Sequence, residues 1–394
     1  RLDIKGTGTT NNFVLRIQDS NAATKLLILD SGNVGIGISS TIPSQKLEVQ
    51  GNILTTQEDN PVARGYTDVA NSPLTIYVSG KYAYVLNIGS VSLNIYELSN
   101  PNSIVTKAST GVGLSSPQGL YVSGKYAYVT NYDTTRLSIF DISNPDSITT
   151  KGNTGVGLSN PQSVYVSGKY AYVASGGNNR LAIFDISNPD SIVAKAYTNV
   201  GLDWPYKVYV SGKYAYVMNP FCIFDISNPD SIVTKNNTGV YAQGGLHVSG
   251  KYAYLVDNGP GRLYIYDISN PDFIVARGNT GVGVSNPISV YVSGKYAYVA
   301  NYDSNRLSIY DISNPDSIAT KGYSSTYLGG CQGLFISGKY AYVTNDGNSR
   351  LVAFELNNTD TPTFNTGAAT ISNLQVYDNA QFDNDVYIRS GLTV

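Results

Sequence analysis

The hexapeptide Ser123-Gly-Lys-Tyr-Ala-Tyr128 recurs along the chain and decides its fold. Its copies begin at Ser79, Ser123, Ser167, Ser211, Ser249, Ser293 and Ser337. Successive copies are separated by 44, 44, 44, 38, 44 and 44 residues. A period of about 40–45 residues is typical of the four-stranded blades of a β-propeller and is too long for a leucine-rich repeat. The sequence therefore predicts an all-β fold whose main body is a seven-bladed β-propeller.

One copy of the repeat contains four short segments rich in Val, Ile and Tyr, which favour strands. We expect these strands at residues 119–123, 125–131, 136–142 and 147–152. Ser-Gly-Lys makes a tight turn between the first two strands because glycine tolerates a positive φ. Ser-Asn-Pro-Asp connects the third strand to the fourth because proline fixes φ and the polar side chains bond nearby backbone. The pattern leaves no room for helices.

A segment that resembles a fourth strand, residues 61–66, precedes the first full copy of the repeat. We expect this segment to pair beside residues 351–356, the third strand of the last copy. The seventh blade then combines strands from both ends of the repeat region, which closes the ring and leaves no free sheet edge. The propeller is therefore predicted over residues 61–360, and the chain enters and leaves it at one blade.

The repeat unit also resembles a known family. Lys125-Tyr-Ala-Tyr-Val129 together with Leu137-Ser-Ile-Phe-Asp-Ile-Ser-Asn-Pro145 resembles the LVIVD-repeat family of bacterial and archaeal surface-associated β-propellers. The resemblance extends over about residues 61–356. It implies a propeller fold and a surface or extracellular setting. The family shares no catalytic residues, so the resemblance implies no enzymatic activity.

The flanks, residues 1–60 and 361–394, do not follow the repeat and are predicted to be short β-rich segments. The C-terminal flank advances in steps of six residues, with apolar residues at the second and fourth places of each step. A single strand of this kind cannot bury its apolar face alone. We therefore expect it to pack against other copies of the same chain.

The N-terminal flank contains Gly32-Asn-Val-Gly-Ile-Gly37 and Lys46-Leu-Glu-Val-Gln-Gly-Asn-Ile53. These segments resemble the shafts of phage tail fibres and related bacterial surface fibres, which are usually trimeric. The resemblance implies a homo-oligomeric β shaft, expected as a trimer. Because the chain enters and leaves the propeller at one blade, we expect the shaft to carry the propeller as a lateral disc.

Composition excludes several classes of partner. With 26 Lys plus Arg against 28 Asp plus Glu, the formal net charge is -2. The chain therefore offers neither a basic surface for nucleic acid nor a polybasic patch for an anionic membrane. No apolar run approaches the roughly 20 residues of a membrane helix, so we expect no membrane insertion.

Few side chains are candidates for chemistry, and we predict no catalytic, cofactor-binding or metal-ligating residue. His247 is the only histidine and stands where other repeats have Tyr77, Tyr121 or Phe335, which favours a packed strand residue. Cys222 replaces a strand serine and Cys331 replaces a loop proline, and neither has a motif that activates a thiol.

Recurrent acidic residues such as Asp141 precede the turn between the third and fourth strands. Turn formation and ion pairing with lysines such as Lys125 account for them better than a metal does. The Asp-containing loops at Tyr132-Asp133 and Tyr302-Asp303 leave calcium as a secondary alternative, although neither has the spacing of a calcium-binding loop.

Differences between repeats gather in the loops that connect the second strand to the third and one blade to the next, which share one face of the disc. Variable loops on a rigid scaffold often carry recognition residues. We predict a ligand-binding loop face made of Trp204, Tyr206, Tyr241, Tyr327, Tyr132, Tyr302, Arg136, Arg180 and Arg306.

For two parts of this predicted face, the tryptophan and the arginines, the sequence also allows a second interpretation. Trp204 is either an aromatic platform for a sugar or protein partner, or a loop residue packed against its own blade. The arginines that begin the third strand either surround the channel mouth for an anionic ligand or pair with loop aspartates.

Three functions follow as hypotheses. The first is a non-catalytic extracellular fibre or adhesin subunit, on a cell surface or a virion-associated fibre, that binds a glycan or protein receptor. The second is a purely architectural filament subunit. The third is a propeller lyase or hydrolase, which needs an acid and a base that the sequence scarcely supplies.

Overall fold

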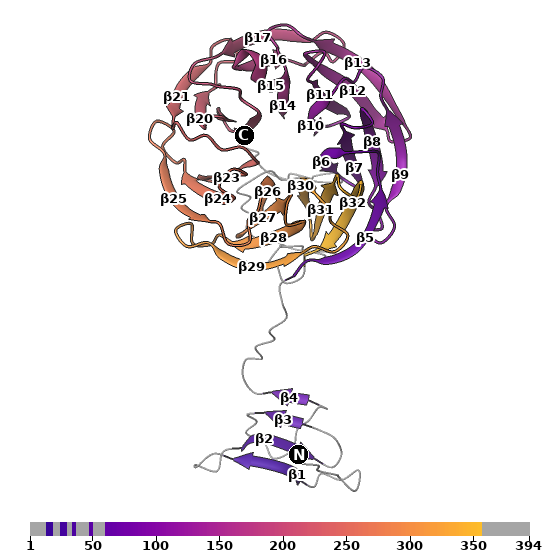
Figure 1. Cartoon of the computed structure of the whole chain (residues 1–394), viewed down its shortest axis with the longest axis vertical. Helices are drawn as coiled ribbons and strands as arrows, with labels where there is room; N and C mark the ends of the chain where they lie inside the picture. Colours follow the sequence, from indigo (N-terminus) through magenta and orange to yellow (C-terminus); the bar gives the residue numbers. More distant parts are fainter. Residues whose placement is uncertain (1–12, 19–23, 30–33, 37–46, 50–59, 357–394) are drawn as a thin grey trace, which may run out of the picture. The chain divides into compact units, whose positions relative to one another are not determined.

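The computed structural model describes residues 13–18, 24–29, 34–36, 47–49 and 60–356 (Figure 1). The chain divides into two compact units, Arg1–Glu58 and Asp59–Val394. The predicted C-terminal shaft segment, residues 361–394 with its six-residue steps, lies outside the described residues. No helix in the described part of the chain is both long and apolar enough to cross a membrane.

The first unit contains one four-stranded sheet in the order β1-β2-β3-β4. Its strands are β1 (Phe13–Gln18), β2 (Thr24–Leu29), β3 (Val34–Ile36) and β4 (Leu47–Val49). β1, β2 and β3 pair antiparallel, whereas β3 and β4 pair parallel. The flank expected to be β-rich thus contains strands, and two of them lie within the segments that resemble fibre shafts.

The second unit is a seven-bladed propeller in which each blade is a four-stranded antiparallel sheet, as the repeat predicts (Figure 1). We name the strands of each blade a to d from the axis outward. The a strands are β6 (Pro73–Ser79), β10 (Pro117–Ser123), β14 (Pro161–Ser167), β18 (Lys207–Ser211), β22 (Leu246–Ser249), β26 (Pro287–Ser293) and β30 (Cys331–Ser337). The b strands are β7 (Tyr82–Asn87), β11 (Tyr126–Asn131), β15 (Tyr170–Ser175), β19 (Tyr214–Met218), β23 (Tyr252–Asp257), β27 (Tyr296–Asn301) and β31 (Tyr340–Asn345).

The two outer strands of each blade complete the disc. The c strands are β8 (Ser92–Glu97), β12 (Arg136–Asn144), β16 (Arg180–Asp185), β20 (Cys222–Asp225), β24 (Arg262–Asp267), β28 (Arg306–Asp311) and β32 (Arg350–Glu355). The d strands are β9 (Val105–Thr110), β13 (Ser147–Thr154), β17 (Val193–Thr198), β21 (Val233–Asn237), β25 (Val275–Thr280), β29 (Ala319–Ser324) and β5 (Val62–Asp68). One short 3-10 helix, η1 (Gly176–Asn178), is the single helical element in the described residues.

The hydrophobic core is divided among the interfaces between neighbouring blades. Strand b is almost wholly buried because a blade covers each of its faces, and this explains its unbroken apolar sequence. Between blades 2 and 3, for example, Tyr128 and Ile139 pack against Val164, Val166 and Phe184. Each blade therefore depends on both neighbours for burial of its side chains.

The ring closes through the seventh blade, as the sequence predicts. β5 pairs antiparallel with β32, so that Val352 lies opposite Tyr66 and Glu355 lies opposite Val62. The Arg350 guanidinium lies 4.1 Å from the centre of the Tyr66 ring and 3.2 Å from Asp68 Oδ1. The described chain thus enters and leaves the ring side by side in one blade.

The Ser-Gly-Lys-Tyr turn has the same geometry in all seven blades. Its glycine is left-handed, with φ of +56° at Gly124. The lysine that follows lies over the next tyrosine ring, at 5.4 Å in the pair Lys125 and Tyr126. Asp141, at the other turn on this face, accepts hydrogen bonds from the Ser143 backbone and hydroxyl. The recurrent aspartates therefore form turns, as expected.

Ion pairs also connect neighbouring blades at the outer rim. Lys107 of strand β9 lies 2.8 Å from Asp146 in the next blade, and Lys195 lies 2.8 Å from Asp230. Lys235 and Asp272 repeat the arrangement at 2.9 Å. Their aspartates are exposed, so each pair contributes little stability, but the repeated spacing helps to align adjacent blades.

Candidate binding cavity at the ring axis

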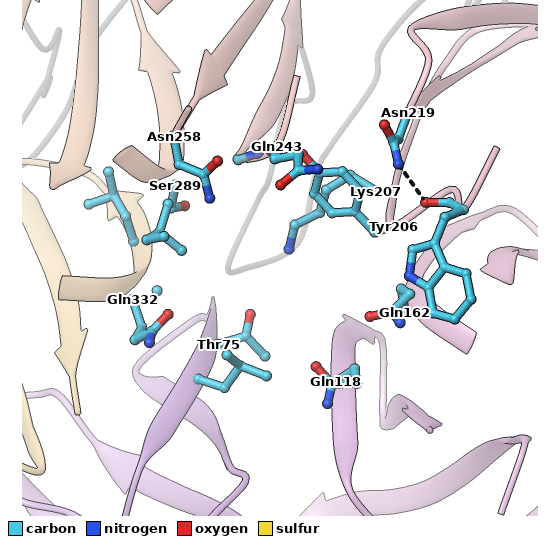
Figure 2. A pocket seen from close by; sticks show the side chains of 16 residues that line it. Thr75, Gln118, Gln162, Tyr206, Lys207, Asn219, Gln243, Asn258, Ser289 and Gln332 are labelled. Carbon is cyan, nitrogen blue, oxygen red and sulfur yellow. Dashed lines mark hydrogen bonds between the residues drawn. The ribbon is translucent and has the colours of Figure 1, made fainter. Parts of the chain in front are cut away.

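A cavity of about 460 Å³ lies where the a strands begin, on the face that carries the b–c and d–a loops (Figure 2). Its size falls in the range of about 300–1,000 Å³ that is usual for small-molecule sites. Blades around the whole ring contribute to its wall, because the a strands are the innermost strands (Figure 1). Propeller closure is therefore what creates the cavity.

Most of the wall comes from the second and third residues of the a strands. Gln118, Gln162 and Gln332 hold the second position of β10, β14 and β30. Gln243 precedes β22, and Asn258 belongs to the b–c loop of the same blade. Figure 2 shows these five amide side chains around a common space. The wall is thus polar but largely uncharged.

Several of these amides are free to bind a ligand. The side chains of Gln118, Gln162, Gln243 and Asn258 lack a hydrogen bond to any residue that the structure describes. Each amide carries two N–H donors and a carbonyl acceptor. The cavity therefore offers donors and acceptors on several sides.

The Gln332 side chain is oriented by an aspartate that lies behind the cavity wall. Its Nε2 donates to Asp346 Oδ2 at 3.0 Å, and the Tyr302 hydroxyl lies 3.4 Å from the same oxygen. The nearby Asp346 carboxylate raises the pKa of Tyr302. Tyr302 thus supports a wall residue without itself lining the cavity.

Trp204 lines the cavity from the loop that joins blades 3 and 4. Its backbone N–H donates to Asn179 Oδ1 at 2.7 Å, and its carbonyl accepts from Asn219 Nδ2 at 3.1 Å. The indole lies against Gly176 of η1, where an added Cβ would come within 3.2 Å of the ring. The side chain is still 45% exposed. Trp204 therefore packs on the preceding blade and keeps an accessible surface at the cavity.

Tyr206 is the second predicted residue that lines the cavity. Its hydroxyl donates to the Ala242 carbonyl and accepts from the Gly244 N–H of the next blade. Burial raises the pKa of the Tyr206 phenol. The hydroxyl is thus a structural bridge between blades 4 and 5, and its ring serves as wall.

Lys207 is the single charged residue among those that line the cavity. It begins strand β18, at the position that aligns with Thr75, Ser163 or Gly333 in other blades. Figure 2 shows its side chain directed into the cavity. Burial lowers the pKa of the Lys207 amine. The amine has no hydrogen-bond or ion-pair partner within residues 60–356.

A closed ring of aromatic side chains surrounds the axis farther along the a strands. Its members are Tyr77, Tyr121, Tyr165, Tyr209, His247, Tyr291 and Phe335. Neighbouring ring centres lie between 4.6 and 5.2 Å apart. These residues stand one to four positions after the wall residues that strand a and the residues just before it contribute. The aromatic ring therefore surrounds the propeller axis between the cavity and the Ser-Gly-Lys turns.

The structure places His247 in this aromatic ring, buried as expected. Burial lowers its pKa to about 3, so the imidazole is neutral near pH 7. Cys222 and Cys331 are also buried, and burial raises the pKa of each thiol to about 12. One expectation is corrected: Cys331 is the first residue of strand β30 and does not lie in a loop, because the bulged start of strand a already pairs with Asn345.

The other predicted tyrosines lie apart from the cavity. Tyr241 is exposed. Tyr327 packs on Tyr66 of the outermost strand, with ring centres 4.8 Å apart. Tyr132 does not line the cavity, and Tyr302 lies behind Gln332. The predicted loop face is therefore not gathered into one site, and only Trp204 and Tyr206 reach the cavity.

The predicted arginines occupy the outer half of the disc. The guanidinium of Arg180 lies 4.4 Å from the ring centre of Tyr197, and that of Arg306 lies 4.2 Å from Tyr323. Arg136 begins the equivalent strand in blade 2 and is exposed. In the described structure, Arg180 and Arg306 therefore lie on tyrosines of strand d, and neither lines the cavity nor forms an ion pair with a loop aspartate.

Metal-ligating side chains do not cluster in the described part of the chain, where no three of His, Cys, Asp or Glu lie together. At the loop considered for calcium, Asp303 Oδ1 instead accepts a hydrogen bond from Asn286 Nδ2 at 3.0 Å.

The sequence contained a signal for the wall residues that loop reasoning missed. The second and third positions of strand a differ from blade to blade within an otherwise repetitive strand: Gln118, Gln162 and Gln332 share one position with Leu74 and Ile288. Lys207 is the only charge at the third position. Variation at these two positions, in a strand that otherwise changes little between blades, therefore indicates a binding site as well as variation in the loops does.

Comparison with solved structures identifies other propellers. The computationally designed Ika8 protein has a TM-score of 0.53 at 9% identity, covering 76% of this chain and 99% of its own. Virginiamycin B lyase from Staphylococcus aureus has a TM-score of 0.56 at 12% identity, covering 74% and 98%. The periplasmic gluconolactonase of Pseudomonas aeruginosa has a TM-score of 0.54 at 15% identity, covering 65% and 85%. At these identities the likeness concerns the fold alone.

A search of curated proteins found no match. The family model of the LVIVD repeat, in contrast, matches seven segments, at residues 74–110, 116–155, 160–199, 206–238, 242–278, 285–326 and 329–352. These segments cover more than half of the chain and coincide with the seven blades. The chain belongs to the LVIVD-repeat family.

Proposed function

We propose that the propeller is a non-catalytic binding module of an extracellular fibre, and that its axial cavity holds a small carbohydrate. The observation that carries this proposal is the cavity wall of unpaired amides beside one accessible indole. Amides match sugar hydroxyls because both groups donate and accept hydrogen bonds. An indole stacks on the apolar face of a sugar ring.

Binding accounts for the described wall better than catalysis does. General acid–base catalysis needs a pair of titratable groups close to the reacting atoms. The titratable side chains among the described wall residues are Tyr206, whose hydroxyl bridges two blades, and Lys207. A lyase or hydrolase function is therefore the weaker hypothesis, and turnover of a bound sugar would support it.

In this proposal the flanks assemble with identical chains, in a trimer as in related fibres, and the assembly acts on a cell surface or a virion. Support comes from the strands in the first unit and from the likeness of its sequence to fibre shafts. When several weak sites share one shaft, binding at one site raises the effective concentration of receptor at the others. A single propeller then does not need high affinity.

Glycan-array binding of the full chain tests the proposal. We expect Trp204→Ala to reduce binding about tenfold or more, since it removes the stacking surface. Tyr241→Ala is the matched control, because Tyr241 is an exposed aromatic residue of an equivalent loop outside the cavity, and it should bind as the unmodified chain does.

Two results would contradict the proposal. Equal loss in both variants would place recognition outside the cavity. Absence of binding, combined with filaments in electron micrographs, would favour the purely architectural subunit. Light scattering of the full chain tests assembly separately, and a monomer at all concentrations would exclude the fibre.

A further inference from the structure

Lys207 introduces a positive charge into an otherwise neutral wall. At the same position of strand a the other blades have Thr75, Gly119, Ser163, Gly245, Ser289 and Gly333. Blade 4 therefore places the largest and only charged side chain where the ring elsewhere has small residues.

Among the residues that the structure describes, no carboxylate forms an ion pair with Lys207. A cation enclosed by protein is destabilising unless an opposite charge or several hydrogen bonds compensate it. Of the carboxylates near the cavity, Asp346 Oδ2 accepts from Gln332 Nε2 at 3.0 Å and Asp257 Oδ1 accepts the Gln243 backbone N–H at 3.2 Å. Burial accordingly lowers the pKa of the Lys207 amine. A ligand that brings an anionic group would supply the missing partner.

The surrounding groups define what else that ligand carries. Gln162 of the neighbouring blade and Gln118 of the blade beyond it also face the cavity, with side-chain amides that lack a partner among the described residues (Figure 2). Such a wall suits a molecule with several hydroxyl groups and one anionic group.

One amine matches a singly charged anion best. A carboxylate is neutralised by a single ammonium group and accepts a short, charge-assisted hydrogen bond. A phosphate monoester carries nearly two negative charges near pH 7, so one charge would remain uncompensated. The single cation thus favours a carboxylate over a phosphate.

We propose that the axial cavity selects a carbohydrate that bears a carboxylate, such as a hexuronate or another sugar acid, through an ion pair with Lys207 Nζ. This inference rests on the proposed carbohydrate-binding function and names its ligand class. Trp204 stacks on the sugar ring, and the amides bind its hydroxyls.

Calorimetric titration of the full chain tests this proposal. The ligands are glucuronate, galacturonate and N-acetylneuraminate, each beside a neutral sugar: glucose, galactose or N-acetylglucosamine. We expect at least one acid to bind about tenfold or more tightly than its neutral counterpart, the size of effect usual for a hydrogen bond to a charged group. Lys207→Gln should abolish this preference, so that the acid and its neutral counterpart bind equally tightly.

Lys213→Gln is the matched control. Lys213 belongs to the same blade but lies exposed at the Ser-Gly-Lys turn, where it is 3.9 Å from Asp225. It removes the same charge without touching the cavity and should retain the preference. Circular dichroism checks that both variants are folded.

The remaining outcomes separate this inference from the proposed function. If neutral and acidic sugars bind equally and Trp204→Ala weakens both, the carbohydrate site stands and the role of Lys207 is wrong. If no sugar of either kind binds, both proposals fail. If glucose 6-phosphate binds more tightly than every sugar acid and loses that advantage in Lys207→Gln, the anion is a phosphate and the carboxylate assignment is overturned.

Discussion

His247 shows how one residue changes a property of the ring without changing its geometry. Its imidazole centre lies 5.2 Å from that of Tyr209 and 4.6 Å from that of Tyr291, against 4.6–4.9 Å between neighbouring tyrosines of the ring. The side chain is buried, and Nε2 has no hydrogen-bond partner in the described structure. An aromatic ring of this size fits the position, but a charged imidazolium does not.

Acid should therefore destabilise the fold through His247. Burial lowers its pKa from 6.5 to about 3, so between these values the unfolded chain binds a proton that the folded chain does not. The free energy of unfolding then decreases as the pH falls through this window, by up to about 1.4 kcal/mol per pH unit.

Thermal denaturation of His247→Tyr at pH 7 and pH 4.5 measures this effect. The variant should lose less stability between the two pH values than the unmodified chain. Tyr291→Phe, a control in the same aromatic ring, should lose as much as the unmodified chain. Identical losses in all three proteins would mean that His247 is not the source.

Both cysteines should be inert in the folded chain. Burial raises the pKa of Cys222 and of Cys331 to about 12, and the thiolate is the reactive form. We expect mass spectrometry to find neither thiol alkylated by iodoacetamide at pH 8, and both alkylated in guanidinium chloride. Rapid modification of either thiol without denaturant would contradict the burial that the structure shows.

At the scale of the element, the a–b hairpin depends on backbone conformation more than on contacts. Gly124 has a φ of +56°, and a Cβ added there would meet nothing within 4 Å. The cost of a side chain at this turn is therefore the intrinsic cost of the left-handed conformation.

Gly124→Ala should reduce the free energy of unfolding by about 1–2 kcal/mol. Gly124→Asn is the matched control, because asparagine visits the left-handed region more readily, and it should cost less. Urea denaturation measures both values. A larger cost for Asn than for Ala would show that space, not backbone conformation, limits the turn.

At the scale of the whole molecule, ring closure joins segments almost 300 residues apart in the chain. Ala63 of β5 packs into the cluster that contains Phe354, Val352 and Leu334, and Arg64 contacts Glu355. Removal of β5 would expose this cluster and leave β32 as an open edge.

A chain that begins at residue 69 should therefore unfold at a lower urea concentration, or associate through the open edge, as size-exclusion chromatography would detect. A chain that begins at residue 59 keeps β5 and is the control. A peptide of residues 60–70 should restore stability to the shorter chain. A monomeric shorter chain with an unchanged denaturation midpoint would show that closure contributes no stability.

Local chemistry was enough to predict the propeller. The number of hexapeptide copies sets the number of blades, the Ser-Gly-Lys and Asn-Pro turns set the strand limits, and the unmatched segment at Pro61 predicts the closing strand. These features repeat, and repetition allows each blade to be interpreted from its neighbours. The burial of His247 followed from the same comparison.

The cavity depends on something that no single repeat contains. Lys207, Gln118 and Gln162 come from three blades, 44 or 45 residues apart in the sequence, and meet only because the a strands surround one axis. The place of Arg180 depends on the same property, because its distance from the cavity is set by the order of the strands in the closed ring. The repeated sequence determines the structure of each blade, and closure of the ring determines which residues of different blades face one another.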